Sequence, residues 1–478
     1  MIRTDISTRI KVPEDRSDIG SPAIENLKFP FNLKKDQEAA VEAWINNDFR
    51  GSIVYSTGTG KTEIAFECAR RAARANQPKI KNDGAHDKSI SKFKILLLVP
   101  RIVLIEQNMK RLLQYGISKK NIGAYFGEKK EVREITVSTY QSINNNLDLL
   151  RNSQMIIFDE VHLIGESAKS FNQIFDVVIE DRSKAILGLT ATIDDNDPNF
   201  NTILSILPPV KRYQVKEAVR DGRLAKPVIL PIKVKLTGME RRIYDDCSST
   251  ITSISNKINR YDAQSISLLL RRGGPLAFMA KTWFANVRKR KTLLNCADNK
   301  ITAAADIISK KHPNQRIMVF SETLESVHKL RKELQSKRGI KSYVIESKLK
   351  ANERQEILSK WGDEFYPLLS VHTLEIGYDV PEVGVAIILA NTSNINQTIQ
   401  RIGRVIRKSD GKEAALIYSI YLTGTKDHQT LRTVKEAAGM TQDNYTHVKQ
   451  KAAEAERIGT RRVQKGMIPL ENYLGEFK

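Results

Sequence analysis

Three arginines spaced three residues apart are the first candidates for anion chemistry. In QRIGRVIR (400–407), Arg401, Arg404 and Arg407 occupy every third position, and Gly403 lets another segment approach the backbone closely. A guanidinium keeps its charge and binds phosphate oxygens through two parallel hydrogen bonds. The string is therefore either a solvated basic surface or a group of cations directed at an anion held elsewhere in the chain.

A second string, SIVYSTGTGKTEIAF (52–66), has the composition of a phosphate-binding loop. It predicts a strand, a glycine-rich turn and a helix start, so that backbone N–H groups surround phosphate oxygens, Lys61 adds a positive charge and the Thr62 hydroxyl is a ligand for Mg²⁺. Tyr55 stands where the strict pattern has its first glycine, and a tight turn that happens to end in Lys-Thr is the alternative. The predicted nucleotide-binding residues of this loop are Thr57, Gly58, Thr59, Gly60, Lys61 and Thr62.

Two adjacent carboxylates follow an apolar strand in MIIFDEVHLIG (155–165). Ligands of open α/β sheets bind at the carboxyl ends of the strands. At such an end Asp159 is expected to hold a metal ion, directly or through water, and Glu160 to polarise an attacking water. Paired acids at a strand end also serve as turn residues, and the phosphate-binding loop upstream favours the catalytic interpretation.

The elements that position these groups alternate between apolar runs and amphipathic stretches, which indicates parallel sheets covered on both faces. Residues 236–312 interrupt this rhythm with a helical period. We predict an α/β fold with two parallel-sheet domains separated by a basic helical insertion. The expected strands are 52–56, 94–99, 134–139, 154–159, 185–189 and 227–232 before the insertion, and 316–320, 342–346, 367–371, 385–390 and 414–419 after it.

Composition favours a nucleic-acid partner. The 478 residues allow two or three domains, and 77 basic against 55 acidic side chains leave a net charge of +22, which favours a polyanion. The sequence has no apolar stretch long enough to span a membrane and no signal-peptide pattern. The three cysteines are far apart and form no metal-binding pair, which suits a reducing, cytoplasmic location, either at the nucleoid or, in a eukaryote, in the nucleus.

Taken in chain order, these strings resemble the motifs of superfamily 2 helicases and translocases over residues 31 to about 410. The resemblance implies two RecA-like domains in tandem that close on one ATP with Mg²⁺. It implies that Arg404 and Arg407 are arginine fingers of the second domain, with Gln400 in the same motif, while Arg401 is left to a structural role. An arginine finger contributes roughly 10³–10⁵ in rate, and an i, i+3 pair shares one helical face.

The same resemblance assigns residues in the remaining motifs. Gln37 resembles an adenine-reading glutamine, and Gly377 and Asp379 in LEIGYDVPEV resemble a pair that communicates between nucleotide and nucleic-acid strand. The motifs VPRIVLIEQ, VSTYQSI and MVFSET resemble those that contact the strand. The strand-contacting residues implied in them are Arg101, Thr139 and Ser321.

Three further residues are implied to couple hydrolysis to strand contacts. Thr190 and Thr192 lie in LGLTAT (187–192), which resembles the motif that links the two processes. His162 follows the paired acids, and in DExH relatives the histidine at this place bridges to that motif rather than binding metal.

A basic block in the insertion is a further candidate for nucleic-acid contact. KTWFANVRKRK (281–291) contains five basic and no acidic residues, and it lies about where the family has a thumb-like element. Trp283 and Phe284 could stack on bases, but packing into a core is the interpretation we favour. The expected phosphate contacts are Arg288, Lys289, Arg290 and Lys291.

Within the superfamily, the sequence looks most similar to XPB-like DNA repair helicases and restriction-type motors. FDEVH (158–162) and the stretches 206–229 and 288–300 carry this similarity. Residues 193–200 read IDDNDPNF where XPB proteins have an Arg-Glu-Asp string, and about 30 residues before the motor leave no room for a damage-recognition domain. Opening of damaged DNA by that route is therefore not expected.

We expect an ATP-dependent DNA helicase or translocase that moves 3′ to 5′ and acts in repair or recombination, on single-stranded, forked or junction DNA. Alternatives are the motor subunit of a nuclease or restriction system with a separate nuclease or repair-protein partner, and an ATP-gated clamp. RNA stays open as the track, and no membrane is involved. The expected domains are an extension (1–28), a first motor domain (29–235), the insertion (236–312), a second motor domain (313–425) and a helical tail (426–478).

Overall fold

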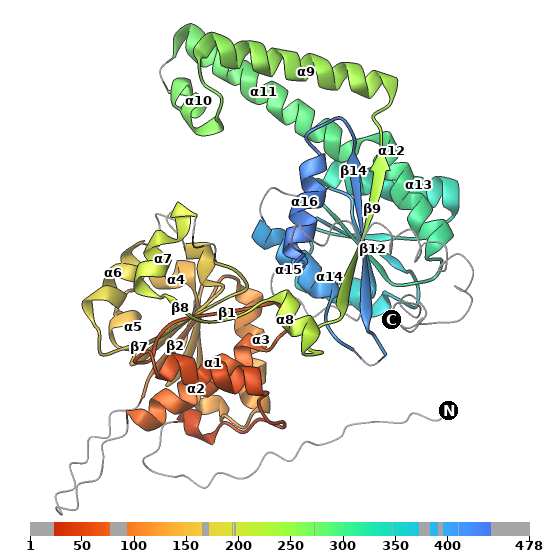
Figure 1. Ribbon diagram of the computed structural model, residues 1–478. Helices are drawn as coiled ribbons and strands as arrows, with labels where there is room; N and C mark the ends of the chain where they lie inside the picture. The colour runs from red at the N-terminus through yellow and green to blue at the C-terminus, as the bar shows by residue number, and fades with distance from the viewer. Residues whose placement is uncertain are drawn as a thin grey trace, which may run out of the picture. The chain divides into compact units, whose positions relative to one another are not determined.

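The structure of this protein is a computed structural model, and its framework consists of two mainly parallel β-sheets (Figure 1). The sequence prediction of two parallel-sheet α/β domains is confirmed. Each sheet is described below by itself. The described residues are 23–76, 93–164, 172–193, 195, 197–271, 273–346, 348–371, 383–390, 395–409 and 411–440.

The first sheet contains eight strands in the order β4-β3-β5-β2-β6-β7-β1-β8. β2 pairs in parallel with β5 and β6, β5 with β3, and β1 with β8, while the short β4 runs antiparallel to β3. The strands are β1 (Arg50–Tyr55), β2 (Ile95–Val99), β3 (Ile122–Phe126), β4 (Lys129–Lys130), β5 (Ile135–Thr139), β6 (Met155–Asp159), β7 (Ala185–Thr190) and β8 (Pro209–Tyr213).

The inner strands are apolar because both of their faces are covered. Every residue of β2, β5 and β7 is buried, as expected for a parallel sheet with helices on each side. The helices that accompany this sheet in the chain are α1 (Lys35–Ile45), α2 (Lys61–Ala75), α3 (Ile102–Gln114), α4 (Tyr140–Asn144), α5 (Asp148–Arg151), α6 (Asn172–Glu180), α7 (Asn201–Ile206) and α8 (Val215–Arg220). Single 3₁₀ turns occupy Ala23–Asn26, Lys119–Asn121, Val161–Ile164 and Pro198–Phe200.

The second sheet contains six strands in the order β11-β12-β10-β13-β14-β9, and all neighbours pair in parallel. Ile317, Leu330, Leu369 and Ile387 form part of its fully buried core. The strands are β9 (Lys226–Val234), β10 (Ile317–Ser321), β11 (Tyr343–Ile345), β12 (Pro367–Val371), β13 (Val385–Ile388) and β14 (Ala414–Leu422). The helices are α12 (Asp298–Asp306), a π-helical turn (Ile307–Lys311), α13 (Leu324–Arg338), α14 (Ala351–Lys360), α15 (Ile395–Val405) and α16 (His428–Ala437).

One predicted strand belongs to the other sheet. We expected 227–232 to complete the first sheet, but the structure pairs β9 with β14 along its whole length, as Figure 1 shows. The apolar pattern identifies a buried strand without identifying its neighbour. Here the neighbour lies almost 190 residues later, since Lys226 aligns with Ala414.

The insertion is helical, as predicted, and its two long helices form a hairpin. α9 (Gly238–Ile258) and α11 (Gly274–Cys296) pack along each other, with α10 (Ala263–Leu270) beside them at the turn (Figure 1). Trp283 is 6% exposed and its indole N–H donates to Ser255 Oγ at 3.0 Å. Its packing with Ile251, Ile254 and neighbouring residues confirms the core interpretation of this tryptophan.

Packing divides the chain into two compact units whose limits cut through the first sheet. One comprises Met1–Gly51, Thr62–Asp159 and Glu166–Gly188, and the other Ser52–Lys61, Glu160–Gly165 and Leu189–Lys478. The phosphate-loop candidate and Glu160 therefore fall in the same unit as the arginine string. None of the helices in the described ranges is both long and apolar enough to cross a membrane.

Candidate active site

The predicted phosphate loop connects the end of β1 to the start of α2. Gly58 and Gly60 have φ angles of +87° and +86°, the left-handed region that glycine enters without steric cost. Thr59 is fully buried, and its hydroxyl donates to Ser56 O at 2.7 Å, which holds the turn closed. The loop therefore has a fixed backbone directly before the N-terminus of a 15-residue helix, where anions bind favourably.

Lys61 is the first residue of α2 and bends back over this loop. Its ammonium donates to the carbonyl of Tyr55 at 3.1 Å. Thr62 follows at the half-buried second position of the helix. A helix N-terminus with an ammonium and a hydroxyl fits the phosphates of a nucleotide and one ligand of a magnesium ion.

The paired acids lie at the carboxyl end of β6. Asp159 is the last residue of the strand, and Tyr140 donates its hydroxyl to the Asp159 carbonyl at 2.7 Å. Glu160 has a φ of +54°, a conformation that costs a non-glycine residue about 1–3 kcal/mol and that clusters at functional sites. Sequence reasoning could not detect this backbone strain.

The Glu160 carboxylate is largely buried, with 14% of its side chain exposed. Its Oε2 atom lies 3.4 Å from Nδ1 of His162 and accepts no hydrogen bond within the part of the chain that the structure describes. Burying an acceptor without a partner is costly. The carboxylate is therefore suited to accept a proton or a hydrogen bond from a water molecule.

His162 connects the acids to the end of β7. Its Nδ1 lies 2.9 Å from Thr190 Oγ1, and that hydroxyl donates to Thr192 O at 3.0 Å. Because the hydroxyl proton of Thr190 is directed at Thr192 O, we assign the proton of the 2.9 Å contact to Nδ1 of His162. The structure thus brings together the three residues that the resemblance implied for coupling, and that role stays a prediction.

Burial lowers the pKa of His162, whose side chain is 5% exposed; Lys61 lowers it further and Glu160 opposes the shift. A lowered pKa means that the unfolded chain binds the proton more readily, so this histidine stabilises the fold above its ordinary value near 6.5 and less as pH falls below it. We expect His162→Gln to lower the free energy of unfolding by about 1 kcal/mol at pH 7.5, and by less at pH 5. Urea unfolding of both proteins at the two pH values measures this difference, and an equal or larger loss at pH 5 would contradict it.

The arginine string lies at the end of α15. Gln400 is 4% exposed and Arg401 is 1% exposed, and Arg401 donates to the Glu322 carboxylate at 2.7 Å, which gives it the structural role left to it. Arg404 is in the last turn of the helix. Arg407 lies beyond the helix, in a bridge with Leu224, so the prediction that the two arginines share one helical face is wrong.

Within the unit that contains both segments, the arginine string lies against the phosphate loop. A Cβ added at Gly403 would lie 2.6 Å from Cβ of Thr57, and one added at Gly58 would lie 3.3 Å from Cγ of Arg407. Gly403 is thus a point of close backbone approach, as its position in the string indicated. Arg223, which no motif marked, donates to the carbonyl of Thr59.

Two predicted strand contacts have other uses in the structure. Thr139 is 8% exposed, and its hydroxyl caps α4 by accepting a hydrogen bond from Ser142 N at 3.3 Å. Ser321 is fully buried, with its Oγ 2.6 Å from Ser326 Oγ. In the structure the Thr139 hydroxyl caps a helix and the Ser321 hydroxyl packs in the core, and their contact with a nucleic-acid strand stays a prediction. Arg101 is exposed directly before α3, where a contact stays open.

Other predicted residues have mixed surroundings. Gln37 is buried near the start of α1, where its Oε1 accepts from Lys34 N at 2.9 Å. On α11, Arg290 is half-buried and donates to Ser248 Oγ at 3.2 Å, while its neighbours in the basic block are exposed. The exposed residues are Arg288, Lys289 and Lys291. Gly377 and Asp379 lie outside the described residues.

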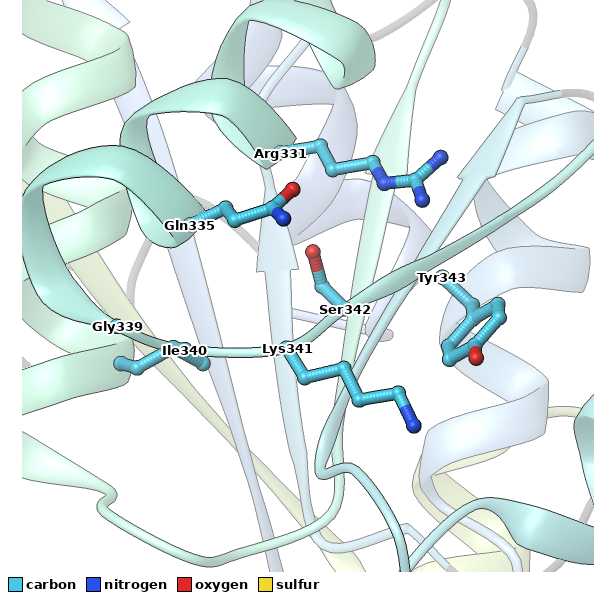
Figure 2. Close-up of a pocket in the computed structure, with 7 residues that line it drawn as sticks. All are labelled: Arg331, Gln335, Gly339, Ile340, Lys341, Ser342 and Tyr343. Carbon is cyan, nitrogen blue, oxygen red and sulfur yellow. The ribbon is translucent and has the colours of Figure 1, made fainter.

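A separate cavity of about 440 Å³ lies at the end of α13 and the edge strand β11 (Figure 2). It contains none of the predicted site residues. Its cations are Arg331 and Lys341, and Lys341 is paired with Glu364 at 3.3 Å. The candidate site is therefore the set of loops at the strand ends, not this cavity.

Two family models match the chain in tandem. The first, described as the res subunit of type III restriction enzymes, matches residues 30–195, and the second, the helicase conserved C-terminal domain, matches residues 299–409. The first match covers the strands that carry the phosphate loop and the paired acids. The second covers the strands before the arginine string and the string itself.

Relatives with similar sequences include named helicases. The chain is 29% identical over 440 residues to the DNA 3'-5' translocase XPB2 of Sulfurisphaera tokodaii, covering 88% of this chain and 90% of that protein. It is 26% identical over 413 residues to the DNA 3'-5' helicase XPB of Mycobacterium tuberculosis, covering 83% of this chain but only 62% of that longer protein.

Solved structures with the same fold include helicase and restriction proteins. The Pyrococcus furiosus Hef helicase domain superposes with a TM-score of 0.54 at 18% identity, covering 84% of this chain and 99% of that one. The DNA-bound type ISP restriction-modification enzyme LlaBIII superposes with a TM-score of 0.57 at 16% identity, covering 94% of this chain and 32% of that one. The chain therefore carries a restriction-type first domain and a helicase C-terminal domain in tandem, and over most of its length it is similar to XPB-type DNA translocases and helicases.

Proposed function

We propose that this protein is an ATP-dependent DNA translocase or helicase that moves 3′ to 5′ along DNA. The observation that carries the proposal is that the strand ends hold a glycine loop closed by Lys61, the strained Glu160 and the His162–Thr190 contact. The likeness to the translocase XPB2 over most of both chains supports DNA as the track and the direction of movement.

The residues at the strand ends have the chemistry that ATP hydrolysis needs. Bound ATP with Mg²⁺ supplies the phosphoanhydride bond whose cleavage drives movement. Lys61 and the N–H groups of the glycine loop would hold the phosphates, and Thr62 and Asp159 would hold the metal. Glu160, with its buried acceptor oxygen, would take a proton from the attacking water.

The same geometry offers a way to transmit hydrolysis. A change at Glu160 reaches Thr190 through His162 by two short contacts, at 3.4 Å and 2.9 Å. Thr190 and Thr192 lead out of β7 toward the chain that carries α8 and β9. This relay would bias the segment after β7 between two arrangements, which is what a nucleotide-driven switch requires.

Arg404 and Arg407 are proposed to stabilise the phosphates during hydrolysis. Replacing either by alanine should reduce DNA-stimulated ATP turnover by about 10²-fold, less than for a lone arginine finger because two guanidinium groups share the charge. Steady-state ATPase assays measure the loss, and circular dichroism checks the fold. Arg432→Ala, a change of an exposed arginine on α16, is the matched control. Full turnover in both site variants would exclude the assignment.

The exposed cations of α11 are proposed to contact DNA phosphates. Changing Arg288, Lys289 and Lys291 to glutamine should weaken binding and lower the slope of log affinity against log salt by about one per lost contact. Arg290 is left in place because it packs on the Tyr244 ring, 5.9 Å away. Glutamine at Lys119, Lys129 and Lys332, all exposed, gives the same charge change elsewhere. Equal slopes of log affinity against log salt in the two triple variants would show that the basic block is a solvated surface without phosphate contacts.

One comparison tests the proposed function directly. ATP turnover is measured in parallel with single-stranded DNA, forked DNA, four-way junctions and RNA, and strand displacement is measured on the same substrates. Stimulation by DNA with strand displacement supports a helicase, and stimulation without displacement supports a translocase or a clamp. Stimulation by RNA alone would refute DNA as the track.

A motor subunit of a restriction or nuclease system is the second candidate. It is favoured by the match of residues 30–195 to the res subunit model and by a 26% identity over 262 residues to the type I restriction enzyme EcoAI endonuclease subunit of Escherichia coli. That similarity covers 49% of this chain and 30% of the relative. Capture of a nuclease with the purified chain would favour this candidate.

A further inference from the structure

A buried lysine outside every motif holds the backbone around the arginine string. Lys412, 8% exposed, lies between α15 and β14. Its ammonium donates to three main-chain carbonyls, those of Val383 at 2.8 Å, Arg407 at 2.9 Å and Val405. An ammonium has three N–H groups, and three backbone carbonyls lie within hydrogen-bonding distance of this one.

One of these carbonyls belongs to Val405, the last residue of α15, and another to Arg407, two residues beyond the helix. The last four carbonyls of a helix have no partner within it, and helices commonly end at a glycine that lets the chain turn back onto them. Here Val405, the last residue of α15, is followed by Ile406 and Arg407, and no glycine occupies those positions. Lys412 takes over the capping role, and its charge is favourable at a helix C-terminus.

The backbone of Arg407 is held on both sides. Lys412 binds its carbonyl, while the preceding carbonyl, that of Ile406, accepts from Ala225 N at 2.8 Å. Arg407 itself forms a bridge with Leu224. These contacts fix where the Arg407 side chain starts, although the residue lies outside the helix.

The third carbonyl connects a different element. Val383 stands two residues before β13, and Gly384 O accepts from Leu416 N of β14 at 2.8 Å. One ammonium therefore joins the end of the arginine helix to the start of the neighbouring strand. Loss of the Lys412 ammonium would leave the carbonyls of Val405 and Val383 without the donor that they share.

We propose that Lys412 is a positioning residue for Arg407, acting through the main chain and not through contact with nucleotide. The inference rests on the proposed function, because it assigns Lys412 an effect on ATP turnover through Arg407. Misplacement of a reacting group by about 1 Å can cost about 10²-fold in rate. A neutral side chain at position 412 should therefore lower kcat although it is remote from the chemistry.

The test is a double-mutant cycle between Lys412→Met and Arg407→Ala, with DNA-stimulated kcat and KM for ATP measured for each protein. Lys412→Met should lower kcat about tenfold or more. In the double variant, kcat should match that of Arg407→Ala within about twofold, because positioning no longer matters once the guanidinium is gone. Multiplying losses would overturn the proposal.

Lys300→Met is the matched control. Lys300 is another buried lysine of the same unit, and it lies on α12, where it is paired with Asp427 at 2.9 Å. Its combination with Arg407→Ala should give multiplied losses, as for independent sites. If Lys300→Met also caused no further loss of kcat in the Arg407→Ala background, the result with Lys412→Met would reflect general destabilisation, and the proposal would fail.

Lys412→Arg covers the case in which the methionine variant does not fold. Arginine keeps the charge but is a planar group that cannot direct three N–H groups in the same way. It should lower kcat by less than methionine does, again without multiplying the loss of Arg407→Ala. Full kcat in a folded Lys412→Arg protein would overturn the proposal. If Arg407→Ala itself kept full turnover, the proposed function of Arg407 would fail first, which distinguishes the two outcomes.

Discussion

A Lys61→Ala variant is expected to show no DNA-stimulated ATP turnover above background, while its binding to DNA is kept. Lys61 is the one cation that the first turn of α2 presents to the phosphate loop, and its ammonium already lies 3.1 Å from the loop carbonyl of Tyr55. Removing it leaves developing phosphate charge without its nearest positive partner, in a site where such charges are poorly screened. Steady-state ATPase assays and DNA binding at one fixed salt concentration measure the two properties.

The matched control is Lys35→Ala. Lys35 is also the first residue of a helix, α1, but it is exposed and follows no glycine loop that could hold phosphate. Its loss should leave turnover within about twofold, since a surface charge at a helix end contributes little. Turnover that persists in Lys61→Ala would show that 56–60 is a tight turn with no phosphate role.

The two sheets were predictable because their inner strands are continuous apolar runs. All eleven predicted strands are present, and β2 and β12 have no exposed residue at all. Two of the three missed strands lack that signal. β8 (PVKRY) lies at one edge of its sheet and is half-buried for most of its length, and β4 at the other edge is two exposed lysines. The third, β3 (IGAYF), is an apolar run that is buried over its first three residues, so the signal was present there and was missed. Edge strands face solvent, so polar residues hide them from a pattern based on burial.

The candidate site was predictable where local sequence determines geometry and less so where long-range packing does. The loop before α2 depends on its own glycines and threonine. By contrast, the end of α15 at Val405, which places Arg407 outside the helix, depends on Lys412 and Ala225, and no spacing rule connects these positions. Similarly, a motif cannot show that the Ser321 hydroxyl turns inward to Ser326.

A Glu160→Gln variant is expected to bind ATP but to hydrolyse it about 10³-fold more slowly, within the range for a lost general base. Glutamine keeps the size and the hydrogen-bonding oxygen of the side chain but cannot take a proton at neutral pH. Nucleotide binding measured by fluorescence and turnover measured in the same buffer separate the two effects. Glu63→Gln, on the first turn of α2, is the control for removing a nearby charge. A loss in affinity without a loss in kcat would assign Glu160 to binding instead.

Glu160→Gly tests whether the backbone strain at this position serves the site. Relief of a positive φ returns about 1–3 kcal/mol, and the added freedom of glycine in the unfolded chain removes about 0.5–1 kcal/mol. We therefore expect Glu160→Gly to be as stable as the parent or more stable by about 1 kcal/mol in urea unfolding, and inactive. Asn314→Gly, at a φ of +58° in a turn, should gain less because asparagine tolerates this region. A lower free energy of unfolding for Glu160→Gly would mean that the Glu160 side chain stabilises the fold. The strained backbone would then not be a cost that the fold bears for catalysis.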